Sequence, residues 1–253
     1  MEAVIIIPAR YGSSRLPGKP LLRETGKYLI QHVYERAMQV RGVAGVLVAT
    51  DDPRIVAAVH SFGGQAVLTR AEHPSGTDRI AEVAAQLTAD LVVNVQGDEP
   101  LIEPAAIEQL LTLLRQDPHC VVATLAAPLR RLADYHNPNL VKVVCDDQGR
   151  ALYFSRAPIP WHRAQQPDFE RQPPLYLQHL GVYAYRRRFL LQLATTPPHP
   201  LEQAEQLEQL RALALGVTIR VGIVSHAHKG IDTPADYAEF VQFYRGEQPR
   251  QAA

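Results

Sequence analysis

Ile5-Ile-Ile-Pro-Ala-Arg-Tyr-Gly-Ser-Ser-Arg-Leu-Pro-Gly-Lys-Pro-Leu21 begins as a short apolar strand and continues as a loop rich in glycine and proline. The loop carries three cations, Arg10, Arg15 and Lys19. Glycine lets main-chain N–H groups approach an anion closely, and Arg and Lys supply charge-assisted hydrogen bonds. A solvated basic loop is the simpler interpretation. The position directly after a strand favours phosphate binding, because open α/β sheets bind ligands beyond the carboxyl ends of their strands.

The residues that follow alternate between strand-like and helix-like patterns. Short, β-branched apolar runs predict strands that are covered on both faces. Apolar residues at i, i+3, i+4 and i+7 predict helices between them. The predicted strands are 4–7, 46–50, 66–68, 91–95 and 121–125, and the predicted helices are 30–37, 55–62, 80–87 and 107–114. This alternation predicts an α/β fold with a mostly parallel sheet and helices on both faces.

The second half of the chain is organised differently. A proline-rich stretch from Pro158 to Pro174 has no periodicity and predicts a long surface loop. The leucines between 201 and 215 cover more than one face of a helix, which predicts burial on several sides, plausibly in a subunit interface. The predicted strands are 137–144, 151–154, 180–185 and 218–224, and the predicted helices are 201–215 and 234–244.

Composition narrows the class of protein. A length of 253 residues suits one large α/β domain, and Lys plus Arg balance Asp plus Glu at 26 each. We therefore expect no nucleic-acid partner and no membrane partner. No apolar run approaches the roughly 20 residues that span a bilayer, and no signal-peptide pattern precedes the first strand. Cys120 and Cys145 lie in apolar runs and are expected to be buried reduced thiols, a single disulfide being the alternative. These features predict a cytoplasmic protein.

Two carboxylates, those of Asp98 and Asp232, each follow a predicted strand and are expected to face the basic loop. Asp98 lies just past the strand 91–95, in a turn made by Gly97 and Pro100. Mg²⁺ prefers oxygen ligands and takes one or two carboxylates together with substrate phosphates, so Asp98 is the first candidate metal ligand. Helix capping is the alternative, and for Asp232, which precedes Thr-Pro, it is about as probable as metal binding when that segment is taken alone. Two carboxylates facing three cations favour the metal.

Other polar segments allow both structural and functional interpretations. The loop from Arg70 to Arg79 leads into a helix N-terminus, which suits hydroxyl or anion contacts as well as simple capping. The segments Phe154–Arg156 and His179–Tyr183 place polar side chains beside strands. The pair His226 and His228 is weak evidence for zinc without further ligands. A dehydrogenase is excluded because no G-x-G-x-x-G pattern follows the first strand.

Ten segments, in order along nearly the whole chain, resemble the 3-deoxy-manno-octulosonate cytidylyltransferases, also called CMP-KDO synthetases. The first block is shared loosely with other sugar nucleotidyltransferases, whereas the later blocks are narrower. The matching segments are Ile7–Leu21, Val48–Asp51, Ser75–Arg79, Val93–Pro100, Asn137–Asn139, Leu152–Arg156, Pro158–Trp161, His179–Tyr183, Leu207–Arg211 and Asp232–Pro234.

The resemblance implies a Rossmann-like nucleotidyltransferase fold in one domain, 1–253, with a mostly parallel mixed sheet and a smaller α+β part. Residues 1–130 would mainly bind CTP, residues 131–217 would mainly bind the sugar acid and form a homodimer, and residues 218–253 would return to the main sheet. The implied enzyme joins CTP and 3-deoxy-D-manno-octulosonate to give CMP-KDO and pyrophosphate for lipopolysaccharide synthesis. The implied cofactor is Mg²⁺, which would assist in-line attack of the anomeric hydroxyl on the α-phosphate.

The resemblance also implies a role for individual residues. Lys19, Asp98 and Asp232 would be catalytic, and the two aspartates would hold the metal. The nucleotide would be bound by main chain and side chains at Ala9, Arg10, Ser13, Arg15, Lys19, Ser75 and Gly76. The sugar acid would be bound by Gln96, Arg156, His179, Tyr183, Glu208 and Gln209.

Two departures from the family and three rival functions bear on this interpretation. The segment His226-Ala-His228-Lys229 ahead of Asp232 is not part of the family pattern. Pro74 precedes Ser75-Gly-Thr where the family has a polar residue, which removes a contact to the nucleotide. The enzyme rivals are a CMP-sialate synthetase and a sugar-1-phosphate nucleotidyltransferase, and the latter would need a basic pocket for a second phosphate. The third rival is a non-catalytic nucleotide-binding module, against which intact Lys19, Asp98 and Asp232 argue.

Overall fold

A computed structural model describes residues 1–12, 15–171, 174–227 and 230–246. The chain packs as two compact units. The first, called here the 2–89 unit, consists of residues 2–89, 94–105 and the segment from 228 onward. The second, called the 106–227 unit, consists of Met1, 90–93 and 106–227. None of the described helices is long and apolar enough to span a bilayer.

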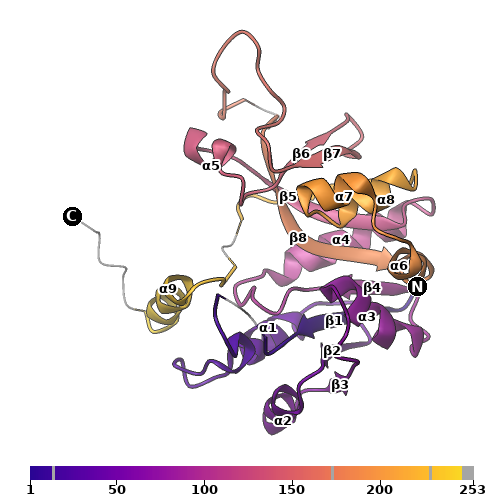
Figure 1. Cartoon of the computed structure of the whole chain (residues 1–253), viewed down its shortest axis with the longest axis vertical. Helices are drawn as coiled ribbons and strands as arrows, with labels where there is room; N and C mark the ends of the chain where they lie inside the picture. Colours follow the sequence, from indigo (N-terminus) through magenta and orange to yellow (C-terminus); the bar gives the residue numbers. More distant parts are fainter. Residues whose placement is uncertain (13–14, 172–173, 228–229, 247–253) are drawn as a thin grey trace. The chain divides into compact units, whose positions relative to one another are not determined.

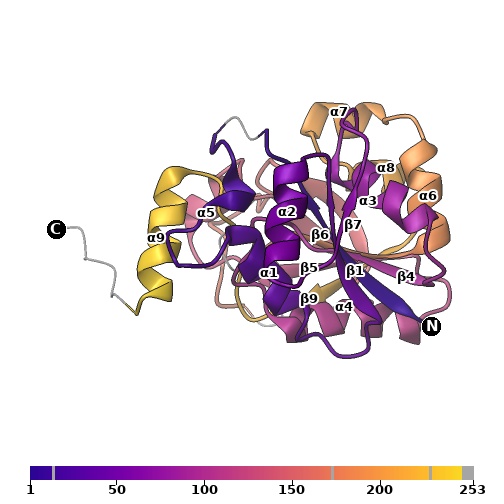
Figure 2. The same ribbon diagram turned by 90° about the horizontal axis from the view of Figure 1, so that it is seen from below.

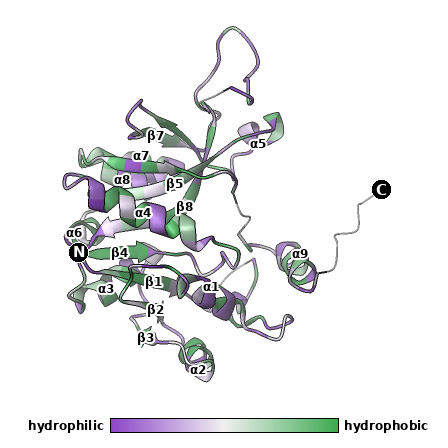
Figure 3. Ribbon diagram, turned by 180° about the vertical axis from the view of Figure 1, so that it is seen from behind, coloured by the Kyte–Doolittle hydropathy of each residue, from purple (hydrophilic) through white to green (hydrophobic). Residues whose placement is uncertain are grey.

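The 2–89 unit is built on three parallel strands. β1 (Ala3–Ala9) pairs with β2 (Gly45–Thr50), and β2 pairs with β3 (Ala66–Leu68). β1 is almost entirely buried and mostly hydrophobic in Figure 3, as a strand covered on both faces requires. The helices of the unit, shown in Figure 1, are α1 (Leu29–Ala37), α2 (Pro53–Ser61), α3 (Gly76–Ala85) and α9 (Pro234–Tyr244), with a 3₁₀ turn η1 (Lys19–Leu21).

Three helices of this unit begin directly after a capping side chain. Asp52 accepts a hydrogen bond from the Arg54 N–H ahead of α2, with Pro53 at the first helical position. The Ser75 side chain accepts from the Asp78 N–H ahead of α3. Thr233 starts α9 in a capping box, in which its hydroxyl and the Asp236 carboxylate satisfy each other's backbone N–H groups.

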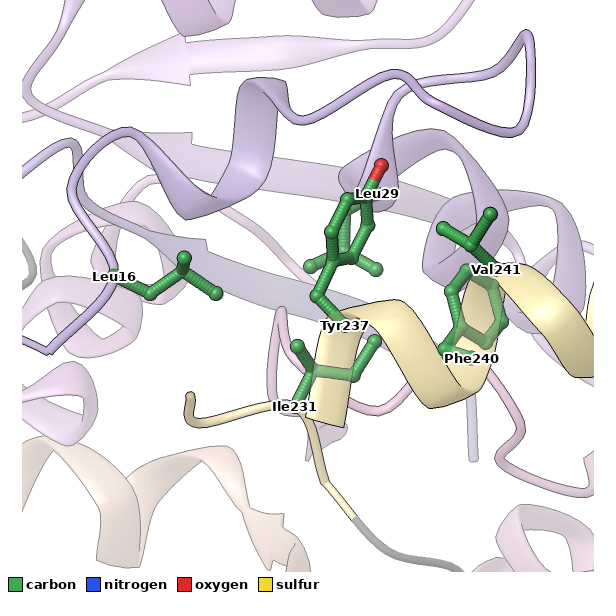
Figure 4. Packing of buried hydrophobic residues seen from close by; sticks show 6 residues of the cluster. All are labelled: Leu16, Leu29, Ile231, Tyr237, Phe240 and Val241. Atoms are coloured by element: carbon green, nitrogen blue, oxygen red, sulfur yellow. The ribbon is translucent and has the colours of Figure 1, made fainter. Parts of the chain in front are cut away.

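Helix α9 packs against the basic loop and α1. Figure 4 shows a cluster in which α9 contributes Tyr237, Phe240 and Val241. The other members are Leu16 from the basic loop, Leu29 from α1 and Ile231. Figure 2 shows α9 beside α1, where the ring of His32 meets that of Phe240 at 5.0 Å. Burial of this cluster therefore ties the basic loop to the segment that carries Asp232.

The 106–227 unit has β5 (Val122–Pro128) at its centre. β5 pairs antiparallel with β8 (Leu177–Arg186) and parallel with β9 (Ile219–Ile223). β6 (Lys142–Cys145) pairs antiparallel with both β7 (Ala151–Ser155) and β8, so the sheet is mixed. β4 (Leu91–Asn94) is buried throughout. The helices are α4 (Pro104–Gln116), α5 (Leu132–His136), α6 (Arg187–Thr195), α7 (Pro200–Glu205) and α8 (Gln209–Ala214).

Three sequence-based expectations for this half are wrong in detail. The strand expected over 137–144 begins only at Lys142, because the preceding Asn-Pro-Asn forms a turn in which the Asn137 side chain accepts from the Asn139 N–H. The helix expected over 201–215 is broken at Gln206 into α7 and α8. Helices α5 and α6 were not expected. Both cysteines are free thiols as expected, but Cys145 is only half-buried.

Candidate active site

A backbone hydrogen bond joins the beginning of the basic loop to its end. Gly18 N–H donates to the Tyr11 carbonyl at 3.1 Å. Gly18 has a φ of 67°, which favours glycine, and a Cβ there would lie 3.2 Å from the Tyr11 ring, so a larger residue would also need that ring to shift. Leu16 is buried, whereas Arg10 and Arg15 are exposed. The loop is thus anchored by an apolar residue and leaves these two cations in solvent. Ser13 lies outside the described residues.

Lys19 lies between the two predicted metal ligands. Its Nζ donates to Asp98 Oδ2 at 2.7 Å and lies 3.5 Å from Asp232 Oδ1. It also donates to the carbonyl oxygen of Ile231 at 2.8 Å. Arg15 reaches the same Asp232 Oδ1 at 3.0 Å. The two carboxylates therefore converge on one position of positive charge, and within the described part of the chain no further His, Cys, Asp or Glu completes a metal cluster with them.

Backbone contacts fix the turn that carries Asp98. Gly97 approaches β1 so closely that a Cβ would lie 2.9 Å from the Pro8 carbonyl oxygen. The Asp98 carbonyl accepts from the Ile231 N–H at 2.9 Å. Because Ile231 is adjacent to Asp232, this bond holds the two aspartates side by side. The sequence order gave no sign of this contact.

Glu99 is a site residue that sequence reasoning missed. It is half-buried beside Asp98. Burial, with a smaller contribution from the Asp98 charge, raises the pKa of Glu99 to about 8. This carboxyl therefore binds a proton more readily than an ordinary glutamate does.

The residues predicted to recognise the nucleoside lie at element ends. Ala9 is the last residue of β1 and is buried. The Ser75 hydroxyl caps α3, donating to Asp78 Oδ2 at 2.7 Å and accepting from the Asp78 N–H at 3.1 Å. Gly76 is the first residue of α3, so its N–H lies at a helix N-terminus. Gln96, predicted to bind the sugar acid, lies two residues after β4, and its amide donates to the Asn94 side chain at 3.4 Å.

In the 106–227 unit, His179 and Tyr183 lie together on β8. Their rings are 5.4 Å apart, and both side chains are more than nine-tenths buried. A bulge between Thr124 and Leu125 of β5 lets the Thr124 hydroxyl reach His179 Nε2 at 3.0 Å. Burial lowers the pKa of His179 to about 3 and raises that of Tyr183 well above its ordinary value. His179 is therefore a neutral imidazole at physiological pH and supplies no positive charge.

Arg156, at the end of β7, bonds to main-chain carbonyls. Its guanidinium donates to Glu205 at 2.7 Å, to Pro138 at 3.0 Å and to Gln206 at 3.4 Å. A guanidinium has five N–H donors, so two stay available on its terminal nitrogens. Sequence reasoning found Arg156 but not its partner Glu205.

Glu208 and Gln209 start helix α8. Glu208 occupies the N-cap position, and Gln209 is 8% exposed. The Gln209 Nε2 atom is buried and finds no hydrogen-bond partner among the described residues. An unsatisfied buried amide is costly, so this group is suited to donate to a bound ligand.

The structure thus brings the predicted residues together in two groups. Lys19, Asp98, Asp232 and Arg15 contact one another in the 2–89 unit. His179 and Tyr183 contact each other in the 106–227 unit, where Arg156 bonds to the α7–α8 junction. No hydrogen bond or ion pair given for the described residues joins Arg10 or Ser75 to the first group.

Comparison with known proteins identifies the class. A family model described as cytidylyltransferase matches residues 4–219. A curated 3-deoxy-manno-octulosonate cytidylyltransferase from Syntrophobacter fumaroxidans is 54% identical over 93% of this chain and 94% of its own length. One from Escherichia coli is 53% identical, over 92% of each chain. A solved CMP:2-keto-3-deoxy-manno-octonic acid synthetase complexed with CTP is 50% identical, covers 98% of this chain and 100% of its own, and superimposes with a TM-score of 0.91.

A more distant structure agrees on the fold. A cytidylyltransferase from Leptospira borgpetersenii is 17% identical, with a TM-score of 0.64 over 100% of this chain and 90% of its own. The fold is therefore that of the nucleotidyltransferases, as the alternation of strands and helices and the resemblance predicted. Within that class, the chain belongs to the 3-deoxy-manno-octulosonate cytidylyltransferases.

Proposed function

We propose that this enzyme transfers the cytidylyl group of CTP to 3-deoxy-D-manno-octulosonate with the help of Mg²⁺. The 2–89 unit would bind the nucleotide and metal, and the 106–227 unit would supply most of the residues that bind the sugar acid. The proposal rests on the family to which the chain belongs and on one observation above all. Lys19 Nζ lies 2.7 Å from Asp98 and 3.5 Å from Asp232, so both carboxylates are aimed at a single cation.

The donor set fits Mg²⁺. Asp98 and Asp232 offer hard carboxylate oxygens, and Mg²⁺ is commonly held by one or two carboxylates together with phosphate oxygens. Bound there, Mg²⁺ would supply Lewis-acid neutralisation of phosphate charge and lower the pKa of a nearby hydroxyl. Lys19 would then be released from the carboxylates and become available to a phosphate.

In the transfer itself, a bond forms between the anomeric oxygen of the sugar acid and the α-phosphorus of CTP. The bond from that phosphorus to the β-phosphate oxygen breaks, and pyrophosphate leaves in line. Little covalent chemistry falls to the protein, so its contribution is positioning and charge neutralisation. Arg10, Arg15 and Lys19 would hold the triphosphate and stabilise the negative charge that develops on the leaving group.

The sugar acid would meet one cation and several neutral groups. Arg156 would offer its two remaining N–H donors to the sugar carboxylate. Gln209 would donate its unsatisfied Nε2 to a sugar oxygen. His179 and Tyr183, both neutral at physiological pH, would supply hydrogen bonds rather than charge, and Glu208 and Gln96 would bind hydroxyl groups. A single cation suits one carboxylate better than a second phosphate, which favours a sugar acid over a sugar 1-phosphate.

The nucleoside contacts, the oligomeric state and the location of the enzyme are proposed from the same family. We propose that Ala9 and the helix start at Ser75 and Gly76 recognise the nucleoside, with Ser13 of the basic loop also contacting the nucleotide. We propose a homodimer in the cytoplasm, where CTP is made, with the product directed to lipopolysaccharide synthesis. No nucleic-acid or membrane partner is required for this reaction.

Site variants test the proposal. Pyrophosphate release from CTP and the sugar acid should fall at least about a hundredfold in Asp98→Asn, because a charged metal ligand is lost. Arg10→Ala should raise the KM for CTP, and Arg156→Ala should raise the KM for the sugar acid. Release at the wild-type rate in Asp98→Asn would remove that residue from the metal site. An effect of Arg156→Ala on CTP alone would contradict its assignment to the sugar acid.

A further inference from the structure

Gln206 has an unusual backbone conformation for its residue type. With φ 53° and ψ 50° it is left-handed, and among the described residues it is the one non-glycine with a positive φ. Left-handed glutamine is strained, and such conformations persist only where surrounding contacts enforce them, often at functional sites. Gln206 ends α7, and the next residues, Leu207 to Gln209, lead into α8. The strained residue thus sets the direction of the segment that carries Glu208 and Gln209.

Glu205 supplies the contacts that hold this turn. Its carboxylate accepts from the Ser155 hydroxyl at 2.5 Å and from the Arg156 N–H at 2.9 Å. Its carbonyl accepts from Arg156 Nε at 2.7 Å. The end of strand β7 and the end of helix α7 are therefore joined through both the side chain and the main chain of one residue.

Lys142, the first residue of the neighbouring strand β6, also contacts Arg156. Its side chain is fully buried, and Nζ donates to the carbonyls of Leu140 and Arg156, each at 2.6 Å, and of Asn137 at 2.9 Å. Burial lowers its pKa, while the Glu205 charge acts in the opposite direction. A buried ammonium is costly unless it is fully hydrogen-bonded, so this lysine fixes both the loop before β6 and the main chain of Arg156.

We propose that Glu205 is a positioning residue for the sugar-acid site. Through Gln206 it sets the turn that presents Glu208 and Gln209, and through Arg156 it orients the guanidinium that would bind the sugar carboxylate. This inference rests on the proposed function of that site. Glu205 itself does not touch the substrate.

The test is steady-state kinetics of Glu205→Gln, which keeps the size of the side chain and removes its charge. The KM for 3-deoxy-D-manno-octulosonate should rise about tenfold or more, because charge-assisted hydrogen bonds are stronger than neutral ones. The KM for CTP should stay within about twofold, since the nucleotide contacts lie elsewhere. Ser155→Ala, which removes one of the two bonds to the carboxylate, should show a smaller rise. Glu170→Gln, at an exposed glutamate of the same unit, is the matched control.

A second substitution separates positioning from general destabilisation. Glycine adopts the left-handed conformation freely, so Gln206→Gly removes the strain at this position while keeping the main-chain carbonyl that Arg156 contacts. Added to Glu205→Gln, it should recover part of the lost sugar-acid affinity, because the turn no longer needs to be enforced. Recovery of melting temperature without recovery of KM would overturn the proposal.

The remaining outcomes are equally decisive. If Glu205→Gln lowers the melting temperature but leaves the sugar-acid KM unchanged, Glu205 is a structural residue only. Equal rises in both KM values would also contradict the proposal. If Glu205→Gln does not fold, Ser155→Ala alone decides, by whether the sugar-acid KM rises while the CTP KM does not. Absence of pyrophosphate release by the wild-type enzyme would instead refute the proposed function.

Discussion

Lys19→Met should make the CTP-free enzyme bind Mg²⁺ more tightly. In the structure the Lys19 ammonium occupies the position to which Asp98 and Asp232 point, so a metal ion must displace it. The side chain of Lys19 is 14% exposed and that of Asp98 is 31% exposed, so their ion pair is partly shielded from solvent. Methionine keeps an unbranched side chain, one atom shorter than that of lysine, and removes the competing charge.

The size of the effect follows from the strength of that contact. A hydrogen bond to a charged group contributes about 1.5–3 kcal/mol, and we take about 2 kcal/mol for this pair. The variant without metal should therefore melt about 4–8 °C lower, at about 2–4 °C per kcal/mol for a chain of this size. Since 1.4 kcal/mol is a factor of ten, removal of the competitor should tighten Mg²⁺ binding by about 30-fold.

Isothermal titration calorimetry with MgCl₂ in the absence of nucleotide measures this directly. Lys27→Met is the matched control, because Lys27 pairs with Glu35 at 2.6 Å in the same unit and both side chains are 39% exposed. Its Mg²⁺ affinity should equal that of the wild type. Equal affinity in wild type and Lys19→Met, or an equal gain in Lys27→Met, would refute the reasoning.

Three further predictions concern stability. Glu202 pairs with Arg211 at 2.5 Å, and both side chains are only 10% exposed. Glu202→Gln should lower the free energy of unfolding, measured by urea titration, by about 3–5 kcal/mol, because it leaves Arg211 as an uncompensated buried charge. A loss under 1 kcal/mol would contradict this. Gly97→Ala should lower the free energy of unfolding by about 1–3 kcal/mol in the same assay, because its Cβ would lie 2.9 Å from the Pro8 carbonyl oxygen. An unchanged free energy of unfolding would show that the turn can move. Burial lowers the pKa of His32 from 6.5 to about 4, so between these pH values the unfolded chain binds more protons than the folded one. The free energy of unfolding should therefore fall by up to about 3 kcal/mol as the pH falls from 6.5 to 4. His32→Asn should flatten this dependence on pH, and an unchanged slope would exclude His32 as its source.

The first half of the fold was predictable because its signals are local. Strand β1 is a continuous apolar run, and the caps at Asp52 and Ser75 depend on residues two or three positions away. The helix break at Gln206 was not predictable in this way. Its residue type favours helix, and the contacts that accompany its left-handed conformation come from Arg156, which lies about 50 residues away in sequence and donates to the carbonyls of Glu205 and Gln206.

In the candidate site, too, local sequence patterns indicated some features, whereas others depend on contacts between distant residues. Sequence patterns indicated Lys19, Asp98 and Asp232 as separate pieces, each with a structural alternative. Their convergence depends on the backbone bond between Asp98 and Ile231, which joins residues far apart in the chain. The raised pKa of Glu99 and the neutrality of His179 also depend on burial, which no short motif encodes.

Pyrophosphate release from CTP and Mg²⁺, measured against a panel of acceptors, tests the central claim most directly. The panel should contain 3-deoxy-D-manno-octulosonate, a nine-carbon 2-keto sugar acid and several sugar 1-phosphates. The account predicts release with 3-deoxy-D-manno-octulosonate, formation of an equal amount of its CMP ester, and little or no release with sugar 1-phosphates. Preference for a sugar 1-phosphate, or no release with any acceptor, would contradict it.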